Sequence, residues 1–107
     1  MVRNVEIDLR KHVITPPQHM TQPSISGLDR QIDQAIVAKP DRVIFNMVSL
    51  QSIDSACLNW MLAAQNRLAA QGIQMLIANP SPLCADVFLA TRLDHRFKIQ
   101  NEEPAHA

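Results

Sequence analysis

Apolar positions along this chain follow two different patterns. Residues 42–48 and 73–78 are apolar almost without interruption, as expected of strands that helices bury on both sides in a mostly parallel sheet. Elsewhere, apolar residues recur every three or four positions, which is the spacing of one helix face. This second pattern predicts helices from Ser24 to about residue 38, from about Ser55 to Gln71, and from about Leu83 to Thr91.

Shorter segments of β-type sequence flank this central part. Val2–Leu9 and His12–Thr15 predict a hairpin, and Phe97–Ile99 alternates like an edge strand. Three prolines between residues 16 and 23 interrupt any regular structure, because each lacks an N–H group and restrains the residue before it. We therefore expect a loop over Pro16–Pro23.

The order of these elements predicts an α/β fold. Strands that alternate with helices imply right-handed crossovers and a small mixed, mostly parallel β-sheet packed by about three helices. Residues 1–100 form a single domain in this interpretation. Residues 101–107 include two Glu and a Pro and lack the apolar residues needed for ordering, so we expect a flexible tail.

The helix predicted over 55–71 has a broad apolar stripe. Its members are Leu58, Met61, Leu62, Gln65, Leu68 and Ala69. Trp60, the only tryptophan, lies two residues from both Leu58 and Leu62 and so points away from this stripe, and we expect it to be partly exposed. Two interpretations stay open: its ring covers the edge of the core, or it is an aromatic anchor for a protein partner.

The apolar pattern also orients the last helix and places the two cysteines. We expect the helix over 83–91 to pack on the sheet through Leu83, Val87 and Ala90, with Asp86 facing water. Cys57 and Cys84 each lie among apolar residues of a predicted helix. This context suits buried thiols in a reducing compartment better than a disulfide.

Asp54 and Ser55 stand where the longest predicted helix begins. Unpaired backbone N–H groups and the positive end of the helix dipole favour negative charge there, including a phosphate. One interpretation is structural, because Asp and Ser are preferred helix caps whose side-chain oxygens accept a backbone N–H. If Asp54 is the cap, Ser55 is left as an exposed hydroxyl in the first turn.

The segment RVIFNMVSLQSIDSACLNWMLAAQNRLAAQGIQMLIANPSP, residues 42–82, resembles the STAS domain, the fold of bacterial anti-sigma factor antagonists. The resemblance covers roughly Ile25–Ile99. Residues that fall where the family pattern requires them are Asn46, Asp54, Ser55, Leu58, Gly72 and Asn79-Pro80-Ser81. Two features depart from the pattern. Ala56 and Cys57 replace a small residue and a glycine, and Gln18–Thr21 replaces a Gly-x-Leu-Asp loop before the first helix.

The resemblance implies a partner-switching protein. In STAS antagonists the serine directly after the aspartate accepts phosphate from a partner kinase, which assigns phosphorylation to Ser55. The unmodified protein would bind a kinase-type anti-sigma factor, phosphorylation would release it, and a serine phosphatase would reset it. The implied partner-binding surface consists of Asn46, Asp54, Ser55, Asn59 and Trp60. Asn46 also has a purely structural interpretation, as a turn residue that satisfies its own backbone.

The same resemblance leaves two alternatives open. The chain could be the small STAS subunit of a bacterial phospholipid transporter, in which the same helix face docks on an ATPase and no phosphorylation is needed. It could also be a STAS scaffold that binds a partner and is never modified. The family fold also has a C-terminal helix, which we do not expect in this chain because only eight residues follow Ile99.

Charge and composition narrow the class of partner. Ten basic and ten acidic residues leave no net charge, so no field attracts the chain to nucleic acid or anionic lipid. The charged N-terminus lacks the apolar core of a secretory signal, and no apolar run approaches the roughly 20 residues of a membrane span. We therefore expect a cytoplasmic protein with no nucleic acid partner and no direct membrane insertion.

The sequence offers little catalytic chemistry. Its four histidines are scattered, without the His-x-x-x-His or Cys-x-x-Cys spacing of a metal site. Cys57 near a helix start could act as a nucleophile with a lowered pKa, but its neighbours Ala56 and Leu58 indicate burial. With two glycines in all, the chain has no glycine-rich phosphate loop. We expect no enzyme activity, no metal site and no cofactor.

Overall fold

Four parallel strands form the main sheet. The computed structural model describes residues 11–100, and these strands are β1 (Lys11–Ile14), β3 (Arg42–Asn46), β5 (Gln74–Ala78) and β6 (Lys98–Gln100). They lie side by side in the order β1-β3-β5-β6, and each of these pairings is parallel. The strands predicted near these positions are therefore confirmed, with shifts of one or two residues at their ends.

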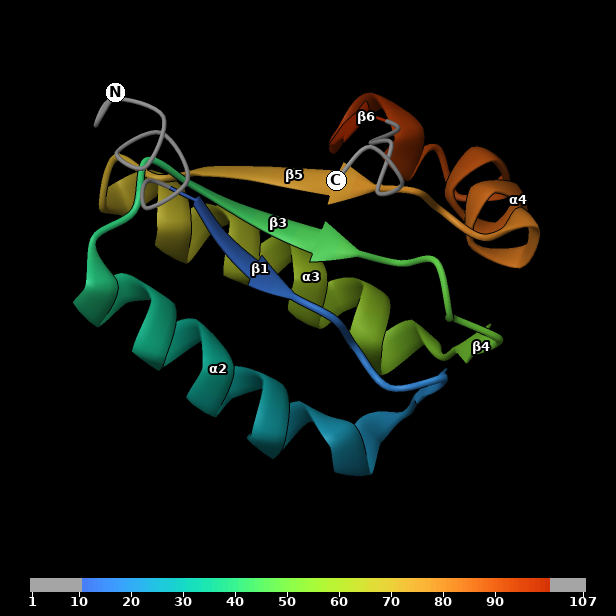
Figure 1. Cartoon of the computed structure of the whole chain (residues 1–107). Coiled ribbons are helices and arrows are strands. Elements are labelled where there is room, and N and C mark those ends of the chain that lie inside the picture. The colour runs from blue at the N-terminus through green and yellow to red at the C-terminus, as the bar shows by residue number, and fades with distance from the viewer. Residues whose placement is uncertain (1–10, 101–107) are drawn as a thin grey trace, which may run out of the picture.

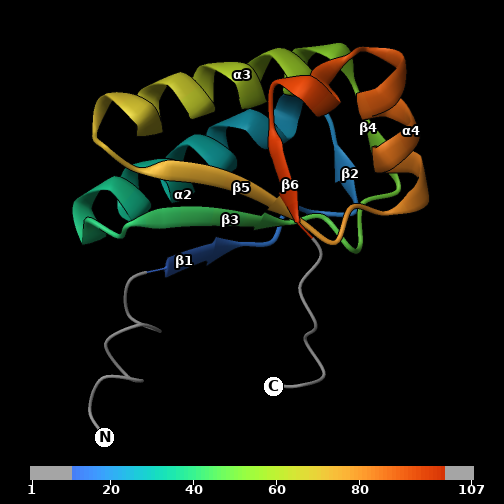
Figure 2. The ribbon, with the colours of Figure 1, turned by 90° about the horizontal axis from the view of Figure 1, so that it is seen from above.

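Three α-helices match the three predicted ones. They are α2 (Ile25–Ala38), α3 (Ser55–Ala70) and α4 (Pro82–Ala90). Figure 1 shows α2 and α3 side by side against the same face of the sheet, and α4 follows the carboxyl end of β5. Figure 2 shows the same layering from above, with α2 and α3 on one side of β1, β3 and β5. The prediction of an α/β fold is confirmed.

Local chemistry explains where these helices begin and end. The Ser81 hydroxyl accepts the Cys84 N–H at the start of α4, and Pro82 fills the first position, where its missing N–H has no cost. Gly72 follows the end of α3 with a φ of 74°, a conformation that glycine adopts without strain. At the end of α2, Lys39 takes the left-handed conformation instead, with a φ of 53°.

A two-stranded sheet forms where the sequence predicts only a loop. Strand β2 (His19–Met20) pairs in parallel with β4 (Ser52–Ile53), and a short 3₁₀ helix, η1 (Gln22–Ser24), leads into α2. The expectation that the prolines exclude regular structure from Pro16–Pro23 is therefore wrong for His19 and Met20 in β2, and for Gln22 and Pro23 in η1. The prolines lie on either side of β2, so its backbone groups remain free to pair.

The core lies between the sheet and the helices. Every buried apolar residue of the three α-helices belongs to one cluster that also includes Val43, Phe45 and Ile77 of the sheet. Each large apolar side chain buried in this way contributes about 1.5–3 kcal/mol relative to an exposed one. A second cluster, Ile44, Leu76 and Ala78, consists of strand residues alone. Because side chains alternate along a strand, it lies on the opposite face.

The expectation that helices bury β3 and β5 on both sides is therefore wrong for the described residues. Val43, Ile44 and Phe45 of β3 are nevertheless all buried, although their side chains alternate between the two faces. Ile44 and Leu76 are register partners, and both are buried. A continuous apolar run thus indicates a central strand here without indicating a helix on each side.

The buried face of α3 differs from the predicted stripe. Met61 and Leu68 are buried as predicted, Leu58, Leu62 and Gln65 are half-buried, and Ala69 is exposed. The other buried residues are Cys57, Trp60 and Ala64. The face is rotated because α3 contacts α2 as well as β5.

The contact face of α4 was also predicted incorrectly. Cys84 and Phe88 are buried, whereas Leu83 and Ala90 are exposed and Val87 is half-buried. Large apolar side chains and cysteine are distributed around most of this nine-residue helix, so the apolar pattern alone does not define one face. These residues are Leu83, Cys84, Val87, Phe88 and Leu89. Asp86 is exposed, as predicted.

Two predictions concern residues beyond the described range. The hairpin strand Val2–Leu9 and the flexible tail over residues 101–107 both lie outside residues 11–100. The partner of β1 among the described residues is β3, which pairs with it in parallel.

Candidate partner-binding site at the start of helix α3

Asp54 is the N-cap of α3, as the sequence predicts. Its backbone is extended, and its Oδ1 accepts the Cys57 N–H at 2.9 Å, which satisfies one of the unpaired donors of the first turn. This hydrogen bond is the main cause that holds the pKa of the Asp54 carboxyl below its ordinary value, and the Gln22 N–H also lowers it. The carboxylate is therefore charged at neutral pH.

The other carboxylate oxygen of Asp54 holds a segment that is distant in the sequence. Oδ2 accepts the Gln22 N–H at 3.0 Å, and the Asp54 N–H donates to the Met20 carbonyl, also at 3.0 Å. Gln18–Thr21, which replaces the family's loop in the sequence comparison, thus packs directly beside the start of α3. One side chain fixes both the helix and this segment.

Further hydrogen bonds secure β2 against β4. The Gln51 N–H donates to the Gln18 carbonyl at 2.7 Å, and the His19 Nδ1 and the Ser52 Oγ are 2.7 Å apart. The surface just before Asp54 is therefore formed by two segments that hydrogen bonds join.

Ser55 is the first residue of α3, and it is exposed. Its hydroxyl makes no hydrogen bond with any residue in the described part of the chain, because Asp54 performs the capping. Asn59 lies one turn further along the same face and is also exposed. The two side chains present a polar surface at the helix end where backbone N–H groups favour an anion.

Trp60 does not belong to this surface. Its side chain is 9% exposed, so the expectation that it is partly exposed is wrong. The indole Nε1 donates to the Asp29 Oδ1 at 2.6 Å, and the ring packs edge-on against Phe45 with 6.0 Å between centroids. Of the two interpretations left open by the sequence, the structure supports a ring that covers the edge of the core.

Asn46 shapes a turn after β3. Its side-chain Oδ1 accepts the Val48 N–H at 3.3 Å, which is the bond of an Asn that satisfies the backbone two residues on. The turn interpretation of Asn46 is thereby confirmed. The residues that follow this turn, 48–51, line a hollow on the surface.

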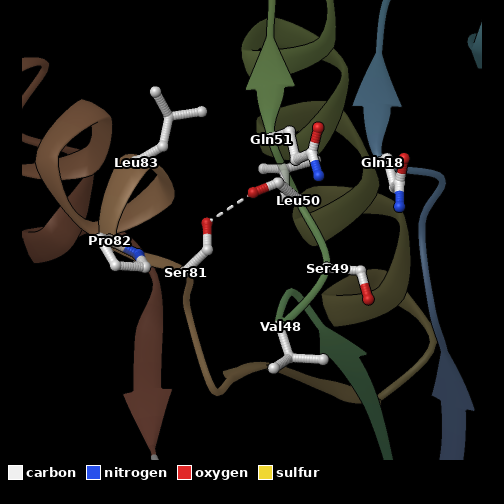
Figure 3. A pocket seen from close by; sticks show the side chains of 8 residues that line it. All are labelled: Gln18, Val48, Ser49, Leu50, Gln51, Ser81, Pro82 and Leu83. Atoms are coloured by element: carbon white, nitrogen blue, oxygen red, sulfur yellow. Dashed lines mark hydrogen bonds between the residues drawn. The ribbon is translucent and has the colours of Figure 1, made fainter.

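The hollow lies at the carboxyl ends of three neighbouring strands, where ligand sites of parallel sheets are commonly found. Figure 3 shows its lining: Gln18 follows β1, residues 48–51 follow β3, and Ser81–Leu83 follow β5. Its volume is about 540 Å³. The Ser81 hydroxyl donates to the Leu50 carbonyl at 2.7 Å and ties two of these loops together.

The character of the hollow is uncharged and partly apolar. None of the described residues that line it is acidic or basic, and Val48 and Leu83 are 56% and 40% exposed. It is joined to the cap through Gln51, which leads through β4 into Asp54. Sequence reasoning missed Gln18, Val48 and Leu83, and the shared edge of parallel strands was the one signal that could have found them.

Cys57 and Cys84 are buried free thiols, as predicted. Burial is the main reason why the pKa of Cys57 is raised to about 11, and hydrogen bonding to Asp54 adds to the increase. Burial also raises the pKa of Cys84 to about 12. Neither thiol has the lowered pKa of a nucleophile.

Within residues 11–100, no three His, Cys, Asp or Glu side chains come together as a group that could hold a metal ion. Over the same residues, no helix is long and apolar enough to cross a membrane.

The comparison with protein families agrees with the geometry. The family model of the STAS domain matches residues 3–105, so the chain belongs to the STAS domain family. STAS domains are protein-interaction modules, and the small, mostly parallel α/β fold is the one expected of them. The search of curated proteins gave no match.

Proposed function

We propose that this STAS module is a partner-switching protein that resembles an anti-sigma factor antagonist and acts in the cytoplasm without enzyme activity. In its unmodified form it binds a kinase-type anti-sigma factor through Asp54, Ser55 and Asn59. Phosphorylation of Ser55 by that partner releases it, and a serine phosphatase resets it. The observation that carries this proposal is the exposed Ser55 hydroxyl, which stays free because the neighbouring Asp54 caps α3.

Phosphorylation at this position changes the surface and leaves the fold intact. A phosphate adds roughly −1.5 to −2 charges, and the helix N-terminus favours that charge. Together with Asp54 it creates a strongly negative patch. A partner surface fitted to a neutral hydroxyl then meets a bulky dianion at a cost of several kcal/mol, which is on the order of a hundredfold or more in affinity.

Incubation with the cognate kinase and ATP is expected to add one phosphate to the chain, located on Ser55 by peptide mass spectrometry. The Ser55→Ala variant is expected to take up none. Ser49→Ala is the matched control, since Ser49 is also an exposed serine but does not begin a helix. Labelling that is unchanged in Ser55→Ala would refute the assignment, and its loss in Ser49→Ala would move the site to Ser49.

The same preparation tests release. The affinity of the phosphorylated chain for its partner is expected to be at least about a hundredfold weaker than that of the unmodified chain. Isothermal titration of both forms measures this difference. Circular dichroism is expected to show equal helix content in the two forms, because the helix dipole accommodates the phosphate.

The uncharged hollow favours a second candidate function. Apolar anchors of a partner could dock between Val48 and Leu83 whether or not Ser55 is modified, which would suit a STAS subunit that binds a transporter ATPase or an unmodified scaffold. Co-purification from native cytoplasm with an ATPase subunit, and without a serine kinase, would favour this candidate over the switch.

A further inference from the structure

A second groove, at the edge of β5, carries positive charge. We name it the basic notch and define it by the residues Gln65, Asn66 and Ala69 of α3, Gln74 of β5, Arg96, and Lys98 of β6. Its volume is about 310 Å³. At 1.5 Å per residue, Asn66 lies about 16 Å along the helix axis from Ser55, so the notch is separate from the surface considered above.

The notch exists because β6 is shorter than β5. Strand β6 pairs only with Leu76, Ile77 and Ala78, so Gln74 and Met75 extend beyond it at this edge. The Gln65 Nε2 donates to the Arg96 carbonyl at 2.8 Å and holds the segment before β6 against α3. The wall formed by α3 and the segment that carries Arg96 are thus fixed relative to each other.

The charge of the notch is unbalanced. Arg96 and Lys98 are exposed, and neither forms an ion pair with any of residues 11–100. The described lining contains no acidic residue. A lysine on a short edge strand has an ordinary explanation, since it discourages pairing with another sheet. That explanation does not cover Arg96, which precedes the strand.

We propose that the basic notch binds an acidic segment of a protein partner. Carboxylates of the segment pair with Arg96 and Lys98, and the carboxamides of Gln65, Asn66 and Gln74 supply donors and acceptors for its backbone. A chain without net charge provides no broad field for a membrane or a nucleic acid, and the volume of the notch suits a few peptide residues. This binding does not depend on phosphorylation of Ser55.

The test is fluorescence anisotropy at low salt with a labelled octapeptide that contains four glutamates. A second peptide, with glutamine at those four positions, is the neutral control. The double variant Arg96→Gln/Lys98→Gln is compared with Arg30→Gln/Arg92→Gln. Arg30 and Arg92 are exposed and do not line the notch. Each double variant loses two positive charges, so the two variants have equal net charge.

The acidic peptide is expected to bind the natural chain, and the glutamine peptide is not. The notch variant is expected to weaken binding at least tenfold, and the control variant less than twofold. Equal weakening by the two variants would indicate general charge attraction and overturn the proposal. Unlabelled acidic peptide is expected to displace the labelled peptide. The proposal would also be overturned if inorganic phosphate or phosphatidylglycerol vesicles displaced the labelled peptide equally well. The Ser55→Ala variant is expected to bind the acidic peptide with unchanged affinity. This result would not depend on whether Ser55 is phosphorylated.

Discussion

At the scale of single residues, Trp60 shows how a neighbouring helix decides exposure. Its place on α3, away from Leu58 and Leu62, predicts partial exposure, yet α2 packs on that side of the helix and supplies Asp29 as a hydrogen-bond acceptor. Arg67 forms an ion pair with the same carboxylate and with that of Asp33. Trp60 is therefore part of the contact between α2 and α3.

Replacement of Trp60 is expected to destabilise the fold. Trp60→Ala removes a large buried ring and is expected to lower the free energy of unfolding by about 3–5 kcal/mol. Trp60→Phe keeps an aromatic ring but loses the bond to a charged acceptor, for an expected loss of about 1.5–3 kcal/mol. Urea denaturation measures both values. Asn59→Ala, an exposed neighbour, is the control and is expected to stay within about 0.5 kcal/mol of the natural chain.

Residue chemistry also limits how much of the candidate site the sequence reveals. The Asp54 cap and the exposed Ser55 follow from helix-start preferences, because capping acts within a few residues of the cap. The bond from the Gln22 N–H to Asp54 connects residues that are distant in the sequence, and a backbone donor leaves no trace in residue type. The sequence therefore predicts the hydrogen bond of Asp54 within α3, but not the one that it forms with Gln22.

At the scale of elements, the clearest predictions come from helices with one apolar face and from central strands. Leu28 and Ile32 are buried on α2 and Ile25 and Ile36 are half-buried, as the spacing predicts. The two-residue strands β2 and β4 are too short for any repeat, so the sequence does not indicate them. The buried face of α4 was predicted incorrectly for the opposite reason, because apolar residues lie around most of this helix.

The end of α2 provides a prediction about an element. Lys39 adopts a φ of 53°, where a residue with a Cβ is strained and a glycine is not. Lys39→Gly is therefore expected to raise the free energy of unfolding by about 0.5–1 kcal/mol, measured by urea denaturation. Gln34→Gly, at an exposed position within the same helix, is expected to lower it by a similar amount. Destabilisation by both variants would show that the strain at Lys39 is negligible.

At the scale of the whole molecule, one core joins the sheet to all three α-helices. The cluster includes residues from Ile14 of β1 to Phe97 just before β6, and it contains both cysteines. The α/β class was predictable from the alternation of strands and helices. The face that α2 and α3 cover was not, because β3 and β5 are apolar on both sides.

The reaction rates of the two buried thiols test whether this core opens as a single unit. At pH 8 the pKa of about 11 for Cys57 and of about 12 for Cys84 leaves little thiolate. Labelling by a disulfide reagent is therefore expected to be at least on the order of a hundredfold slower than in the urea-unfolded chain. Cys57→Ala and Cys84→Ala assign each rate. Fast reaction of one thiol in the folded protein would show that its helix opens independently of the rest.

The double use of the Asp54 carboxylate has a consequence for cooperativity. Its two oxygens serve the first turn of α3 and the segment that leads into α2, so displacement of the whole carboxylate frees both partners at once. A docking protein that pulled the carboxylate away would disturb both regions in one event. The order of two distant parts of the chain is thus linked through a single ionised group.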